Sequence, residues 1–167
     1  MSRENINCTI LGSFKFKKDI DLVREEFEDH GVKVLAPEKG QVYSPPLVRH
    51  IQIANSFRPL PSERHHPIKM VEDTFLRAIT MSDFTYLVDI DGYIGNVVSM
   101  EMGFVIARDI PLYASNAVDT RLDPDPDWQF QVRKIPVMAP IGALQDFKIK
   151  HCQENESETL VSLHLFP

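Results

Sequence analysis

The spacing of apolar residues predicts a strand, a helix and a second strand in the first part of the chain. Residues 7–11 (Asn-Cys-Thr-Ile-Leu) form a short β-type run that ends at a glycine, which is typical of a strand. Apolar side chains then recur at helical spacing over residues 20–27, and a second apolar run covers residues 32–35. Three such elements within about thirty residues match the size of a parallel βαβ unit.

The same alternation returns further along the chain. Helical spacing over residues 70–79 predicts a helix. Residues 84–88 are β-branched and aromatic on both faces, which predicts a strand in the middle of a parallel sheet. Residues 96–107 then predict a helix and residues 110–114 another strand. Residues 1–167 are therefore expected to form one α/β domain, with a three-layer, flavodoxin- or Rossmann-like open parallel sheet of about five strands.

Several stretches interrupt this alternation. Residues 38–67 contain five prolines, and so long a connection in a compact domain is usually a lid, a binding loop or a disordered segment; the spacing within it is compatible with a short helix over residues 46–56. Residues 116–128 are acidic and rich in proline, which predicts an exposed loop. Residues 136–144 leave room for one more strand, and residues 150–167 are expected to form a tail with a solvated acidic part.

Composition excludes several classes of protein. Of the 167 residues, 43% are hydrophobic and 25% charged, which is ordinary for a globular domain, and a net charge of −6 gives no basic surface for nucleic acids. Cys8 and Cys152 lie far apart, and the pair His65-His66 lacks the spacing of metal ligands. The first residues are polar, and no apolar run approaches the ~20 residues that span a bilayer. We therefore expect a cytoplasmic protein without a disulfide, a metal or a cofactor.

The first candidate site follows the first strand. In open parallel sheets, ligands bind beyond the carboxyl ends of the strands, which here are the loops after residues 11 and 88. Gly12-Ser13-Phe14 begins the first of these loops, where small residues let backbone amides approach an anionic ligand. The competing interpretation is that a glycine–serine turn simply lets the chain leave the strand.

The second candidate site is a set of carboxylates around the central strand. Asp89 and Asp91 follow that strand, where they could bind ribose hydroxyls, act as acid–base groups or cap the turn. Glu101 lies among apolar residues of the next helix, so its side chain is either buried at a cost or directed into the cleft at the strand ends. Such a carboxylate could be a nucleophile or an electrostatic stabiliser, unless it is an ordinary surface glutamate. Glu72 and Asp73 open the preceding helix, where the helix dipole alone explains acidic residues.

Together these pieces resemble the nucleoside 2-deoxyribosyltransferase-like superfamily. The matching blocks are Gly12-Ser13-Phe14 and the residues 82–88 (Ser-Asp-Phe-Thr-Tyr-Leu-Val), 92–95 (Gly-Tyr-Ile-Gly), 100–104 (Met-Glu-Met-Gly-Phe) and 110–113 (Ile-Pro-Leu-Tyr). The resemblance covers roughly residues 8–114. The members of the superfamily include transferases and nucleotide N-glycosidases, and many form homo-oligomers.

The resemblance implies roles for individual residues. Glu101 falls where the family has its nucleophile, which attacks the anomeric carbon of a (deoxy)ribosyl group while the base leaves. Gly12 and Ser13 fall where the family lines the pocket for the sugar or its 5′-phosphate. The other residues expected to contact a nucleoside or nucleotide are Phe14, Gly92, Tyr93, Gly95 and Asn96, with Asp89 and Asp91 as further acidic candidates.

The chain departs from the family pattern at two positions. The family's aspartate in the helix before the central strand is replaced by Phe75, and the nearest acids, Glu72 and Asp73, lie about a turn upstream. Six residues before the nucleophile, transferases have an aspartate and phosphate-using hydrolases a serine, whereas this chain has Gly95. These departures favour hydrolysis over transfer. They leave open a non-catalytic nucleotide-binding module of the same fold and a hydrolase of a larger nucleotide cofactor such as NAD.

Overall fold

The computed structural model describes residues 5–40, 60–122 and 125–150 of the chain. The predictions for residues 46–56 and for most of the tail lie outside these ranges. The main elements are β1 (Ile6–Gly12), α1 (Lys17–Asp29), β2 (Val32–Ala36), α2 (Ile68–Thr80), β3 (Phe84–Val88), α3 (Asn96–Ala107), β4 (Leu112–Ala114), α4 (Pro126–Val132) and a helix over residues 140–150. None of the helices within the described ranges is both long and apolar enough to cross a bilayer.

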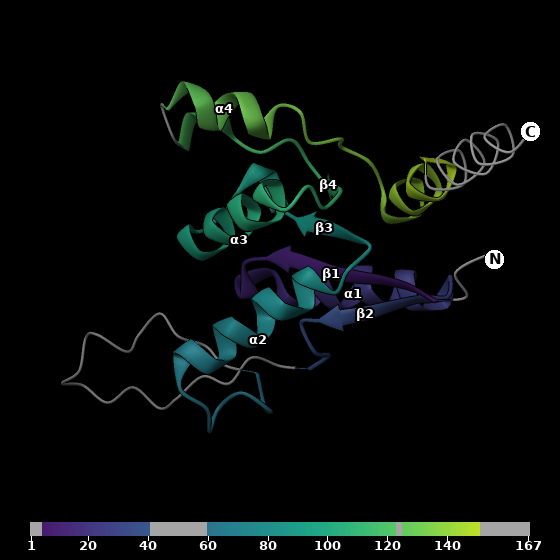
Figure 1. Ribbon diagram of the computed structural model, residues 1–167, viewed down its shortest axis with the longest axis vertical. Helices are drawn as coiled ribbons and strands as arrows, with labels where there is room; N and C mark the ends of the chain where they lie inside the picture. Colours follow the sequence, from purple (N-terminus) through teal and green to yellow (C-terminus); the bar gives the residue numbers. More distant parts are fainter. Residues whose placement is uncertain (1–4, 41–59, 123–124, 151–167) are drawn as a thin grey trace, which may run out of the picture.

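The strands form one parallel sheet in the order β2-β1-β3-β4, and helices cover both of its faces (Figure 1). The predicted three-layer α/β fold is therefore confirmed, with β3 in the interior of the sheet and all five of its residues buried. Because each connection returns the chain to the same end of the sheet, the loops after β1 and β3 leave at one edge.

The predicted number of about five strands is wrong, because the described residues contribute four. Where residues 136–144 left room for a fifth strand, Val137 makes a single parallel bridge to Ala114, and a helix begins at residue 140. Pro136 has no N–H group to donate to a strand ladder, and Pro140 occupies the first position of that helix, where proline is favoured. Only three residues remain between the two prolines, and of these Val137 alone pairs with the sheet.

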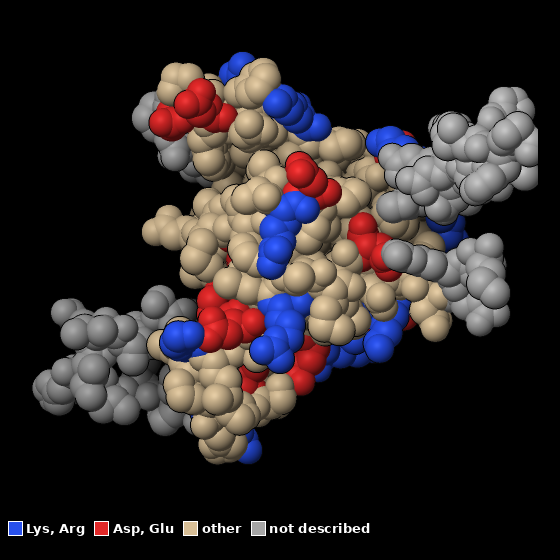
Figure 2. Space-filling view, viewed as in Figure 1, with Lys and Arg blue, Asp and Glu red and all other residues tan. Residues whose placement is uncertain are grey.

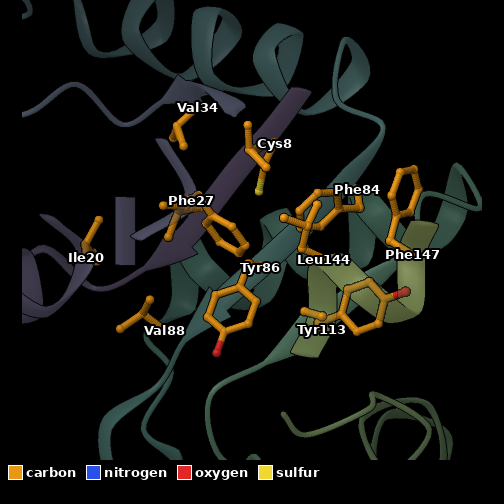
Figure 3. Packing of buried hydrophobic residues seen from close by; sticks show 13 residues of the cluster. Cys8, Ile20, Phe27, Val34, Phe84, Tyr86, Val88, Tyr113, Leu144 and Phe147 are labelled. Carbon is orange, nitrogen blue, oxygen red and sulfur yellow. The ribbon is translucent and has the colours of Figure 1, made fainter. Parts of the chain in front are cut away.

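One face of the sheet packs against α1 and the helix over residues 140–150. Aromatic rings fill this layer, and Figure 3 shows Phe27 from α1 directed toward Phe84 and Tyr86 from β3. The centroid of the Phe27 ring lies 5.5 Å from that of Phe84 and 5.4 Å from that of Tyr86, in edge-to-face contacts. Phe147 extends the cluster from the last described helix to Phe84, with the centroids 5.1 Å apart.

The other face packs against α2 and α3, which lie side by side in front of the sheet (Figure 1). Its core contains Ile79 from α2, Leu87 from β3 and Met102 and Val105 from α3. The candidate nucleophile belongs to this layer, because it is on α3. The position of Glu101 relative to the sheet therefore depends on how α2 and α3 pack against it.

The prediction of an exposed loop over residues 116–128 is wrong at its end, where α4 begins. The Asp125 carboxylate accepts hydrogen bonds from the N–H groups of Asp127 and Trp128, at 2.9 and 3.0 Å, and Pro126 is the first helical residue. This is a strong helix start, since an aspartate cap followed by proline satisfies free amides and fixes the first backbone angle. The helix is only seven residues long, so hydrophobic spacing gives little sign of it, although Val132 is buried against the α3 layer.

Candidate functional site

The loops after β1 and β3 meet at the same edge of the sheet, as the parallel topology predicts. The ring of Phe16, from the first loop, contacts the ring of Tyr93, from the second, edge-to-face with centroids 5.9 Å apart. The Lys15 ammonium lies 3.0 Å from the centroid of the Tyr93 ring, which is a cation–π contact between the two loops. Lys15 and Tyr93 are both exposed, so this contact lies on the surface of the site.

Gly12 is required by the close approach of the two strand ends. A Cβ atom at this position would lie 2.8 Å from the carbonyl oxygen of Val88, closer than real Cβ atoms come. Ser13 follows in an extended conformation, and its carbonyl accepts a hydrogen bond from the N–H of Phe16 at 2.8 Å. Phe14 is partly buried and packs against the aromatic core on the α1 face of the sheet. Of the three residues, Phe14 is therefore the one whose side chain is used mainly in packing.

Asp89 is fully buried at the end of β3 and joins this strand to the end of β4. Its Oδ1 accepts hydrogen bonds from the Ser115 hydroxyl at 2.9 Å and from the Asn116 N–H at 3.0 Å. Its Oδ2 is buried and has no hydrogen-bond partner among the described residues. Burial outweighs the hydrogen bonds and raises the pKa of Asp89 to about 6. The geometry gives Asp89 a structural contact that sequence reasoning did not identify.

The rest of the β3–α3 loop is held in a fixed conformation. Asp91 is exposed and has a φ of 54°, and Gly92 has a φ of +74°. A Cβ atom on Gly92 would lie 2.6 Å from the carbonyl oxygen of Ala117, so only glycine fits there. Gly95 is the N-cap of α3 and Asn96 its exposed first residue, with no side chain capping the helix. The amides at this end of α3 point toward the edge where the two loops meet.

Glu101 is buried on α3, with 6% of its surface exposed, so it is not an ordinary surface glutamate. Burial raises its pKa to about 8, with a further contribution from the negative charge of Glu72 on α2. At neutral pH, the Glu101 side chain is therefore mostly protonated. Of the alternatives that the sequence left open for Glu101, the structure shows the buried one.

Glu72 is the residue that sequence reasoning did not assign to the site. The helix α2 begins at Ile68, two residues before the predicted start, so Glu72 lies beyond the first turn, where the helix dipole no longer explains it. Its Oε1 is buried without a hydrogen-bond partner among the described residues, and burial raises its pKa, followed by the charge of Asp73. Glu72, Phe75 and Ile79 occupy i, i+3 and i+7 positions, and this spacing could have placed Glu72 on the inner face.

A cavity borders the helix α2. It has a volume of about 360 Å³ and lies between the end of β2, residues 62–66 and α2. Its walls include Pro37, Val71 and Phe75, with Glu38, Glu63 and His66 as polar groups, and they do not include Glu101. Phe75, which stands where the superfamily pattern has an aspartate, thus gives α2 an apolar side chain between the core and this cavity.

The histidine pair lies at the border of that cavity, as an exposed part of the segment before α2. The Nε2 atom of His65 and the Nε atom of Arg64 are 3.0 Å apart and form a hydrogen bond. Within residues 5–40, 60–122 and 125–150, no three histidine, cysteine or acidic side chains gather as metal ligands would.

The arrangement can supply a nucleophile and an acid from two adjacent helices. Burial and the charge of Glu72 both raise the pKa of Glu101, and burial raises the pKa of Glu72, so the two carboxylates oppose each other's ionisation. Pairs of this kind carry out acid–base chemistry with one group ionised and the other protonated. Comparison of the chain with known proteins finds no matching family model, no matching curated protein and no matching solved structure.

Proposed function

We propose that the protein breaks the N-glycosidic bond of a nucleoside or nucleotide, with Glu101 as the nucleophile. The observation that carries the proposal is the buried carboxylate of Glu101 on α3, together with Glu72 on α2, a partly buried residue whose Oε1 atom has no hydrogen-bond partner among the described residues. A buried glutamate without an ion pair is costly for the fold, and this cost is typical of functional sites. The resemblance of the surrounding sequence to deoxyribosyltransferases and N-glycosidases gives the chemistry to test.

In the proposed reaction, a carboxylate oxygen of Glu101 attacks C1′ of the sugar as the C1′–N bond breaks. The electron pair of that bond goes to the base nitrogen, and Glu72 donates a proton to the base. Positive charge that develops on the sugar favours the ionised form of Glu101, so in the proposed reaction the Glu101 proton moves to Glu72 as the substrate reaches the transition state. Water that has lost its proton to Glu72 then attacks C1′, which frees the sugar and the Glu101 carboxylate.

The loops at the sheet edge supply the contacts with the substrate in this proposal. Gly12 and Ser13 present backbone groups to the sugar or its 5′-phosphate, and Asn96 presents an amide beside the uncapped start of α3. Tyr93 offers a ring whose face is now occupied by Lys15 and which a base could share by stacking. Hydrolysis is preferred to transfer because Gly95 stands where transferases have an aspartate, so the side chain that grips the sugar in transferases is missing.

The experiment is an incubation of the purified chain with a panel of nucleosides, deoxynucleosides and their 5′-phosphates, followed by chromatography of the released base. We expect Glu101→Gln to lower the rate by about three orders of magnitude or more, and Glu72→Gln by about 10²–10⁴-fold. Glu28→Gln, on the exposed face of α1, is the matched control and should keep the wild-type rate. Release of base that persists unchanged in Glu101→Gln would exclude this residue as the nucleophile.

The second candidate function is the binding of a nucleotide without chemistry. The observation that favours it is the raised pKa of Glu101, which keeps most of this group protonated, and therefore not nucleophilic, at neutral pH. A binding module would gain thermal stability with a nucleotide by mass action and release no base. Thermal-shift and base-release measurements on the same panel separate the two functions, and nicotinamide release from NAD tests the third possibility raised by the sequence.

A further inference from the structure

The cavity that borders α2 has the size and the position of a small-molecule site. Its volume of about 360 Å³ is within the range of such sites, and it lies at the carboxyl end of β2, next to Ala36 and Pro37. In open parallel sheets, ligands bind at this end of the strands. The walls are mostly apolar, with Val71 and Phe75 contributed by α2. They therefore suit the carbon skeleton of a small molecule.

Two carboxylates line the same cavity, and the backbone holds each of them in place. Glu38 accepts a hydrogen bond from the N–H of Ser62 at 3.0 Å, and Glu63 accepts one from the N–H of Leu60 at 2.9 Å. Each bond uses one oxygen, and the second oxygen of each carboxylate has no hydrogen-bond partner among the described residues. Both residues are partly buried. Two oriented acceptors are therefore left for a ligand.

The charge of these two carboxylates is not neutralised within the described part of the chain. Neither of them forms an ion pair there, and no lysine or arginine is among the described residues that line the cavity. Lys39 follows Glu38 in the sequence but forms an ion pair with Glu25 on α1. On the outer side of α2 the charges are balanced: Figure 2 shows positive and negative groups next to each other where α2 lies in Figure 1, and Lys69 and Asp73 form an ion pair. The cavity therefore disfavours phosphates and other anions and favours a cation.

We propose that this cavity binds a protonated amine with an apolar body. The ammonium group donates hydrogen bonds to the second oxygens of Glu38 and Glu63, and the carbon skeleton packs against the apolar walls. The two amides that hold the carboxylates are two residues apart, so one ammonium, with its three N–H donors, can reach both. His66, at the exposed border, is the remaining titratable group of the cavity. The site does not depend on the proposed function, since Glu101 is not part of its walls.

The test is isothermal titration calorimetry of the full chain near neutral pH, with three probes of similar shape and different charge. They are 2-phenylethylamine, which is a cation, the uncharged 2-phenylethanol and the anionic 3-phenylpropanoate. We expect the amine to bind with a Kd below about 1 mM, the alcohol to bind at least about tenfold more weakly, and the anion not to bind. Ethylamine tests the apolar walls and should bind at least about tenfold more weakly than 2-phenylethylamine, because it lacks the ring that they would bury.

Substitutions in the cavity separate charge from shape. Glu38→Gln and Glu63→Gln keep an oxygen for the backbone amide and remove the charge, so each should weaken amine binding about tenfold or more and leave alcohol binding within about twofold. Thr74→Phe places a ring in the cavity from an exposed position of α2 and should prevent binding of both. Asp29→Asn, at the exposed end of α1, is the matched control: it also removes one negative charge and should bind the amine like the wild type.

The circular dichroism spectrum of each variant checks that it is folded. An amine Kd above about 1 mM, or no saturable binding of the amine, would overturn the proposal. So would an alcohol or an anion that binds as tightly as the amine, or ethylamine that binds as tightly as 2-phenylethylamine. The same holds for amine binding that Glu38→Gln and Glu63→Gln leave unchanged, or that Asp29→Asn weakens equally. None of these measurements depends on base release, so this proposal and the proposed function fail separately.

Discussion

Glu101 is the residue whose ionisation changes most between the unfolded and the folded chain at the candidate site. Its pKa rises from 4.5 to about 8, because the folded protein removes the carboxylate from water and places Glu72 beside it. Between these pH values, the folded protein holds a proton that the unfolded chain has released. The free energy of unfolding contributed by Glu101 is therefore fully present below pH 4.5 and is lost as the pH rises toward 8, by up to about 1.4 kcal/mol per pH unit.

Glutamine has the shape of the protonated side chain and cannot ionise. We therefore expect Glu101→Gln to remove most of this slope and to raise the free energy of unfolding near pH 8 by about 2–4 kcal/mol. Urea denaturation at about pH 5 and about pH 8 measures both effects. Asp91→Asn, in the exposed turn, is the control and should keep the wild-type slope. A variant at position 101 with the same slope as the wild type would show that this carboxylate is ionised in the folded protein.

The position of the second carboxylate could not be predicted from residue types alone. Acidic residues at the start of a helix are common for electrostatic reasons, and hydrophobic spacing predicted a helix whose first turn contained Glu72. The structure begins α2 at Ile68, and this difference of two residues moves Glu72 into the second turn, facing α3. Helix ends are the least certain part of any prediction from periodicity, because the first residues need no apolar partner.

Elements with a strong pattern were predicted closely. The strand β3 and the helix α3 have the predicted bounds, since the residues of β3 are β-branched, aromatic or aliphatic and buried throughout, and α3 continues to the Arg108–Asp109 turn. The meeting of the loops after β1 and β3 follows from parallel pairing and was predicted as well. The hydrogen bonds from Ser115 and Asn116 to Asp89, which join the ends of β3 and β4, were not predicted. They depend on which polar groups of two loops come within hydrogen-bonding distance.

Asp89 links the ends of β3 and β4. Two substitutions at this position are expected to change the free energy of unfolding in opposite directions. Its pKa rises from 3.8 to about 6 through burial, so its contribution to stability is lost as the pH rises through this range. Asp89→Asn keeps an oxygen for Ser115 and Asn116 and carries no charge, so we expect the free energy of unfolding at neutral pH to rise by about 1–2 kcal/mol. Asp89→Ala removes the acceptor for both donors, and we expect a loss of about 1–3 kcal/mol.

Urea denaturation of both Asp89 variants near pH 7.5 measures the difference. The same comparison near pH 4, where the wild-type carboxyl is largely protonated, should show a much smaller gain for Asp89→Asn. Equal losses in the asparagine and alanine variants at neutral pH would mean that an interaction specific to the ionised carboxylate stabilises the junction of β3 and β4.

At the scale of the whole molecule, the sequence signal is strongest up to residue 114 and weakens beyond it. Segments with the residue pattern of a strand alternate with segments whose apolar residues have the helical period of 3.6. This alternation predicted the α/β class, the layers and the interior strand. Past β4 the chain has short elements fixed by caps and prolines, namely α4 after Asp125 and the bridge at Val137. Such elements depend on a few local contacts and on the core that they cover, so the hydrophobic pattern of their own residues carries little information about them.

The helix over residues 140–150 is nevertheless part of the core. Phe147 is 5% exposed and packs on Phe84, and the hydroxyl of Tyr113 donates a hydrogen bond of 2.9 Å to Asp146 on the same helix. Truncation of a buried phenylalanine leaves a cavity, so we expect Phe147→Ala to lower the free energy of unfolding by about 3–5 kcal/mol. Phe130→Ala, on the exposed side of α4, is the matched control and should change it by less than about 0.5 kcal/mol.

The measurement is urea denaturation followed by two probes. Far-UV circular dichroism reports all helices, and the fluorescence of Trp128 reports α4, on the other side of the sheet from Phe147. If the residues after β4 fold together with the sheet, both probes shift to the same lower midpoint in Phe147→Ala. A Trp128 transition that stays at the wild-type midpoint while the dichroism changes would mean that the last described helix unfolds separately. The fold would then consist of a sheet with α1, α2 and α3 as its cooperative unit, and a helix over residues 140–150 that docks on it.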